Sequence, residues 1–279
     1  MLNVGKTTRR TSAERWKGYL NFGSIALAAM TLTAQAATAP THIDVTKYST
    51  KVEDVVVPLP NEVFGALNKL GSVNWKEYVR ADRSNNFTER PRIALVLGSV
   101  IADGFIAVQA KDAPAVKDIG QRVLKLSTAI GVGNSITSHA KAIMESADKS
   151  RWENVRSELD ATQNSVQQAM NEVHDQQLSQ LVSLGGWLRG TEVLTAVVTK
   201  NYTINGAELL HQPDLLSYFQ DKLKAMPEFN TGLLKQIHGA LVEVKPLIDI
   251  TPTQRISPES VKKINDITTR LDNAIVTKD

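Results

Sequence analysis

Three charged side chains stand inside two otherwise apolar stretches, and their types suit chemistry in a buried setting. Asp103 interrupts the stretch Val96 to Asp112, and Arg189 and Glu192 interrupt a second stretch, Leu181 to Val198. A lone buried carboxylate is costly, so buried charges are normally paired, and the planar guanidinium group of arginine suits a carboxylate. We therefore predict a buried polar cluster in which Asp103 pairs with Arg189, while Glu192 shares the same guanidinium group.

The same side chains allow other interpretations. They could line a central cavity that binds a ligand, or they could serve an enzyme, for example a hydrolase that uses Asp103, Glu192 and Arg189. Alternatively, Asp103 faces water or another cation, such as Arg122 or Lys125. No catalytic residue is assigned, because the sequence contains no G-x-S-x-G, H-E-x-x-H or glycine-rich phosphate motif, and no serine stands beside a recognisable base.

One pair of residues has metal-ligand spacing. Glu208-x-x-His211 matches the spacing used by di-iron sites in helical bundles, but such sites need two of these pairs and this sequence has one. A metal- or cofactor-carrying bundle is therefore the weaker alternative. We expect this pair to be solvated at the surface, and we expect neither a metal nor a cofactor.

Four glycines in the two apolar stretches predict that two helices cross closely. Gly98 and Gly104 belong to the first stretch, and Gly186 and Gly190 lie on one face of the second. An interior glycine costs a helix about 1 kcal/mol relative to alanine, so this many glycines need a packing reason. Both stretches are apolar around their circumference, which is typical of central helices. Two membrane spans are the competing interpretation, and the embedded charges argue against it.

The rest of the sequence has helical periodicity and few strand signals. Helices are predicted at 61–71, 75–80, 89–112, from Pro114, and at 135–148. Ser150 is predicted to cap the next helix in a capping box with Glu153. The period breaks at 174–177, which leaves either one long helix with a phase shift or two helices in line. Later helices are predicted to start at Pro213, Pro227 and Pro258. The predicted fold is an all-α, antiparallel multi-helix bundle with two central glycine-rich apolar helices.

The first 36 residues resemble a secretory signal peptide in composition. They contain five basic residues and one acidic residue, then an apolar run, and Ala34-Gln35-Ala36 has the small-x-small pattern of a cleavage site. An uncleaved anchor is the alternative. We therefore expect a cleaved signal peptide at 1–36, an extended lead-in at 37–60 and a single helical domain at 61–279.

Removal of the signal peptide changes the charge balance. The chain has 32 basic and 29 acidic residues, a net charge of +3, whereas the part after residue 36 carries −1. No basic stripe for nucleic acid remains, and the absence of cysteine excludes disulfides and a thiol nucleophile. The predicted function is that of a soluble cell-envelope protein, periplasmic or secreted, which binds a partner or a small ligand. Neither catalytic chemistry nor a membrane span is expected in the mature chain.

Overall fold

The computed structural model describes residues 49–52, 55–58, 60–81, 87–172, 175–226, 232–251 and 253–277. The chain divides into two units, residues 1–39 and 40–279, and the described residues all belong to the second unit. The predicted signal peptide and the predicted helix start at Pro227 lie outside the described residues.

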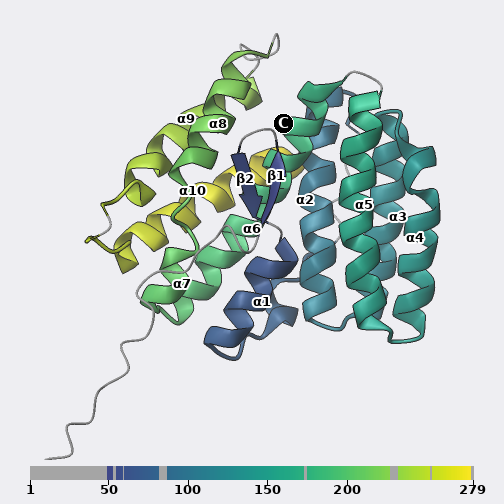
Figure 1. The fold of residues 1–279 in the computed structure, drawn as a ribbon, viewed down its shortest axis with the longest axis horizontal. Coiled ribbons are helices and arrows are strands. Elements are labelled where there is room, and N and C mark those ends of the chain that lie inside the picture. The colour runs from purple at the N-terminus through teal and green to yellow at the C-terminus, as the bar shows by residue number, and fades with distance from the viewer. Residues whose placement is uncertain are drawn as a thin grey trace, which may run out of the picture. The chain divides into compact units, whose positions relative to one another are not determined.

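The regular elements among the described residues are helices apart from one short hairpin, which confirms the predicted all-α class (Figure 1). Strands β1 (Ser49–Val52) and β2 (Val55–Pro58) pair antiparallel, with Ser49 opposite Pro58. The helices that follow are α1 (Pro60–Leu70), the 3-10 helix η2 (Trp75–Tyr78), α2 (Arg90–Gln109), α3 (Ala113–Ala129), α4 (Gly133–Asp148), α5 (Trp152–Glu172), α6 (Gln176–Lys200), α7 (Ile204–Glu208), α8 (Pro213–Lys224), α9 (Gly232–Ile248) and α10 (Pro258–Val276).

Helices α2 to α5 stand side by side as successive antiparallel neighbours (Figure 1). Three-residue connections link them, and connections this short require consecutive helices to run in opposite directions. Each of α3, α4 and α5 buries a single stripe of apolar residues spaced three or four apart, as in Val116, Ile119 and Val123 of α3.

Each of the three connections contains one residue in the left-handed conformation. Lys111, Gly131 and Ser150 have φ angles of 53°, 92° and 52°. Each donates its N–H to the carbonyl three residues back, and the next residue donates to the carbonyl five residues back, which is the Schellman ending of a helix. The prediction that Ser150 caps α5 is therefore wrong, because Ser150 belongs to the ending of α4. Arg151 precedes α5 instead, and its carbonyl accepts the N–H of Val155 at 3.1 Å.

The break in periodicity near residue 175 separates two helices. Asp175 caps α6 by accepting the N–H of Leu178 at 3.2 Å, so a new helix begins at Gln176. The predicted starts at Pro213 and Pro258 are confirmed, and Ser257 caps α10 by accepting the N–H of Ser260 at 3.1 Å.

Helices α2 and α6 form the centre of the second unit. Every residue of α2 from Ile93 to Val108 is buried, and α6 is buried on most of its circumference. Their mutual packing is the most extensive of any pair among the described elements, and α10 also packs against α6. Among the described helices, α2 has the length and composition to cross a membrane, yet 89% of its most apolar window is buried within the bundle.

Candidate functional site

The backbones of α2 and α6 touch at a pair of glycines. A β-carbon built at Gly98 would lie 1.9 Å from the carbonyl oxygen of Val182, and one at Gly185 would lie 2.0 Å from that of Leu95. Both distances are far below any van der Waals contact, so only glycine fits at either position. Gly186 faces Gly98 across the same crossing, and a β-carbon built at Gly186 would lie 3.4 Å from the Gly98 carbonyl oxygen. The sequence analysis found Gly98 and Gly186 but missed Gly185, which makes the closer contact.

The other two predicted glycines do not lie at this crossing. A β-carbon at Gly104 would meet Leu159 at 3.1 Å and Ile119 at 3.4 Å, which belong to α5 and α3. A β-carbon at Gly190 would have nothing within 4 Å. Inclined helices approach closely only near their crossing point, so glycines one or two turns away along the same helices contact other elements or open space.

The structure brings Asp103, Arg189 and Glu192 together beside this crossing. Arg189 Nε donates to Asp103 Oδ1 at 2.7 Å, and these side chains are only 4% and 3% exposed. Arg189 Nη1 pairs with Glu192. Arg189 Nη2 donates to the carbonyl oxygen of Tyr78 at 2.7 Å. Each nitrogen of the Arg189 guanidinium group thus has a partner within the protein.

A second arginine, which the sequence analysis missed, completes the cluster. Arg80 Nη2 donates to Asp103 Oδ2 at 2.6 Å and to Ser99 Oγ at 2.7 Å, while Arg80 Nη1 pairs with Asp272. Ser99 Oγ donates to Asp272 Oδ1 at 2.9 Å. Asp103 therefore meets a further cation, but that cation is Arg80 and not Arg122 or Lys125.

A signal for Asp272 was present in the sequence. Val261, Ile264 and Thr268 precede it at helical spacing, so Asp272 falls on the buried face of α10. Arg80 carried no such signal. It lies just after η2, in a segment without periodicity, and only the packing of that segment against α2 and α10 reveals its role.

The surroundings of Arg189 favour the charged form of its guanidinium group. Burial alone lowers the pKa of Arg189, but the neighbouring Asp103, Glu192 and Asp272 outweigh burial and raise this pKa above its ordinary value. The cluster contains two arginines and three carboxylates, so its charges nearly balance. A guanidinium group that never loses its proton cannot act as a general acid or base. Chemically, this arrangement fixes the positions of α2, α6, α10 and the segment after η2.

Glu208 and His211 were predicted to lie at the surface, but Glu208 is buried, with only 3% of its surface exposed. Glu208 ends the short helix α7, and its carboxylate lies 4.0 Å from Arg255 Nη1. Helix α7 packs against α1 and α6, and this tertiary packing buries a residue that was predicted to lie at the surface. The described residues contain no group of three or more histidines, cysteines, aspartates or glutamates with the geometry of a metal site.

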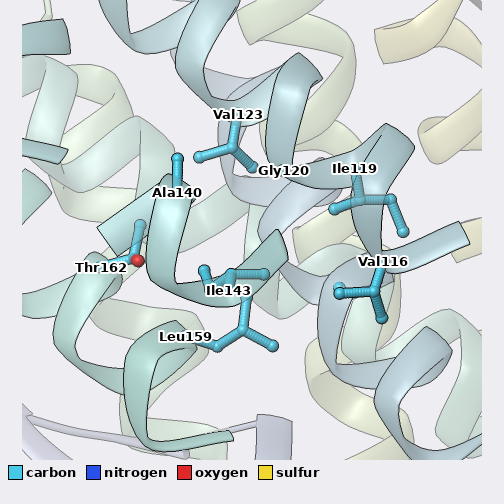
Figure 2. Close-up of a pocket in the computed structure, with 9 residues that line it drawn as sticks. Val116, Ile119, Gly120, Val123, Ala140, Ile143, Leu159 and Thr162 are labelled. Atoms are coloured by element: carbon cyan, nitrogen blue, oxygen red, sulfur yellow. The ribbon is translucent and has the colours of Figure 1, made fainter. Parts of the chain in front are cut away.

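Two small hollows lie elsewhere in the described structure. The first lies between α2, α3, α4 and α5, has a volume of about 10 Å³, and is lined almost entirely by apolar side chains such as Ile119, Ile143 and Leu159 (Figure 2). This volume holds at most one water-sized group. Gly104 and Thr162 also line it. We regard this first hollow as a gap in the packing of the core.

The second is half-open, with a volume of about 20 Å³, and we call it the α1–α6 hollow. It is lined by Val63, Phe64, Gly186, Trp187, Gly190, Thr191, Leu194 and Gln212. Trp187 Nε1 donates to Gln212 Oε1 at 2.9 Å, which positions the indole ring in the wall. Neither hollow is lined by Asp103, Arg189 or Glu192.

Compared with known proteins, the chain matches no family, no curated protein and no solved structure.

Proposed function

We propose that this chain is an exported helical protein of the cell envelope, periplasmic or secreted, which acts by binding a partner or ligand through the α1–α6 hollow. The signal-peptide-like composition of residues 1–36 supports export. The absence of a basic stripe in the remaining sequence argues against a nucleic acid as the partner.

The observation that carries the proposal is the space at Gly190. A β-carbon there would meet nothing within 4 Å, although Gly190 sits in a central helix whose neighbouring residues are mostly buried. A glycine in a helix interior costs about 1 kcal/mol relative to alanine, and packing does not require this one. Its missing side chain opens the α1–α6 hollow.

The lining of this hollow indicates what it binds. Phe64, Trp187 and Leu194 supply apolar surface, while Thr191 and Gln212 supply polar groups. Sites of this composition bind apolar groups and orient them with a few hydrogen bonds. Enclosed pockets for whole small molecules have volumes of about 300–1,000 Å³, so a hollow of about 20 Å³ holds one apolar group of a ligand whose remainder lies outside.

The charged cluster supports binding over catalysis. A catalytic use of Asp103, Arg189 or Glu192 requires at least one group free to meet a substrate, whereas their charged atoms already pair with one another, with Arg80 and with the Tyr78 carbonyl. We therefore assign the cluster a structural role and propose no enzymatic function for it.

Titration of the mature protein with short alcohols, from ethanol to hexanol, tests the α1–α6 hollow. Two-dimensional NMR should show shifts confined to the Trp187 indole N–H and the amides around Gly190. Affinity should increase with chain length up to the size that fits. A ceiling of about 1.5 kcal/mol per heavy atom limits a ligand of about five heavy atoms to a Kd of about 3 μM at best.

Two matched variants make this test specific. Gly190→Leu fills the hollow and should abolish the shifts, whereas Gly239→Leu adds the same side chain at an open position on α9 and should leave them unchanged. Binding that survives Gly190→Leu, or shifts that occur elsewhere in the molecule, would overturn the proposal.

A further inference from the structure

A serine, a histidine and a glutamate form a continuous hydrogen-bonded chain between α4 and α5. His139 Nδ1 lies 2.8 Å from Glu158 Oε2, and His139 Nε2 lies 3.1 Å from Ser165 Oγ. The sequence analysis found no serine beside a base, because His139 and Ser165 are 26 positions apart and meet only when α4 packs against α5.

The local geometry follows from helix periodicity. Glu158 and Ser165 are seven positions apart on α5, so they lie on one face, two turns from each other. His139 extends from α4 and touches both. The histidine and glutamate side chains are 25% and 33% exposed, and Ser165 is half-buried. Unlike the central ion cluster, this group is therefore accessible to molecules in solution.

The hydrogen bonds assign the protons. A carboxylate only accepts hydrogen bonds, so Nδ1 of His139 carries the proton that Glu158 accepts. In the neutral imidazole, Nε2 is then the acceptor, and Ser165 donates its hydroxyl proton to it. A serine is activated when its hydroxyl group is hydrogen-bonded to a base and a third group orients that base.

We propose that Ser165 is a nucleophile that accepts acyl groups from activated esters. As Ser165 Oγ bonds to the ester carbonyl carbon, its proton moves to His139 Nε2. The bond between that carbon and the leaving oxygen then breaks, and the leaving group takes the proton from His139. Water, deprotonated by the same nitrogen, attacks the acylated Ser165, which releases the carboxylic acid and restores the serine.

The position of Ser165 within a helix defines the substrate class. It lies inside α5, where the neighbouring main-chain N–H groups bond to carbonyls of the same helix and cannot stabilise an oxyanion. Loss of one oxyanion donor slows acyl transfer by about 10²–10³-fold. We therefore assign esters with good leaving groups, such as aryl esters, as the substrates, and alkyl esters and amides are excluded.

Reaction of the full chain with p-nitrophenyl acetate tests this activity. We expect a burst of p-nitrophenol close to one equivalent, followed by slow turnover, and peptide mass mapping should place the acetyl group on Ser165. Ser165→Ala should abolish the burst, and His139→Ala should slow it at least tenfold. Ser157→Ala changes an exposed serine of the same helix and should have no effect. Acetylation confined to lysines would overturn the proposal.

A second measurement does not depend on an oxyanion site. The chain has no cysteine, so Ser165→Cys and Ser157→Cys each introduce a single thiol. An imidazole beside a thiol promotes the reactive thiolate. The thiol of Ser165→Cys should therefore react with iodoacetamide at least tenfold faster than the thiol of Ser157→Cys, and the additional substitution His139→Ala should remove the difference. Equal rates for the two single-cysteine variants would show that His139 does not activate this position.

Discussion

At the scale of single residues, the central ion cluster determines how the buried charges contribute to stability. Asp103 has two cationic partners, Arg80 and Arg189, whereas each arginine also has other acceptors. Asp103 is therefore the residue that both arginines share, and its loss takes one acceptor from each of them. This asymmetry was not visible when Arg189 was the only partner predicted from the sequence.

Removal of Asp103 should destabilise the protein, because Asp103 is the acceptor that links the two arginines. We expect Asp103→Ala to lower the free energy of unfolding by about 3–5 kcal/mol, because it breaks two buried ion pairs by removing their common partner. Urea denaturation of Asp103→Ala, Arg189→Ala and the double variant gives the coupling energy of the pair. The exposed ion pair Lys262–Asp266 is a suitable control, since such pairs contribute about 1 kcal/mol or less. Additive effects of the two central substitutions would contradict this account.

At the scale of elements, the crossing of α2 and α6 requires glycine at defined positions. Gly98→Ala would place a β-carbon 1.9 Å from a carbonyl oxygen of α6, so the helices must separate. We expect the free energy of unfolding to fall by about 3 kcal/mol or more, at the upper end of the range for overpacked cores. Gly190→Ala, in α6, should instead be neutral or stabilise by up to about 1 kcal/mol, because its β-carbon meets open space. Thermal unfolding of both variants measures this difference, and similar effects would refute the crossing geometry.

The helix endings predict a second effect at this scale. Lys111 and Ser150 adopt the left-handed conformation that favours glycine. Ser150→Gly and Lys111→Gly should therefore each stabilise the protein, by about 0.5–1 kcal/mol. Gly131→Ala should have the opposite sign, because it introduces a side chain at a φ of 92°. Denaturation midpoints of the three variants give the signs, and a destabilising Ser150→Gly would argue against the Schellman ending of α4.

At the scale of the whole molecule, export should shorten the chain. If residues 1–36 are a signal peptide, the protein recovered from the cell envelope begins at Ala37, after the pattern Ala34-Gln35-Ala36. Intact mass measurement of protein from that fraction identifies the first residue, and Ala36→Leu should block cleavage and retain the longer chain. Recovery of the full-length unaltered chain from the envelope would indicate an anchor instead.

The sequence by itself determined the class of the fold and most helix boundaries. Apolar spacing, proline starts and capping residues are local properties, so the starts of α8 and α10 follow from the residues that form them. The central position of α2 was also predictable, because a helix that is apolar on all sides must be surrounded by protein.

Only the tertiary structure decided which residues meet across the helices. The structure places Gly185, and not Gly190, at the crossing. It adds Arg80 and Asp272 to the predicted cluster, and it places His139 beside Ser165. Each of these contacts joins residues from different elements. Periodicity indicates which face of a helix is buried. Which side chains touch depends on the axial offset and the inclination of the two packed helices. The offset and the inclination depend in turn on the packing of all the side chains between the helices.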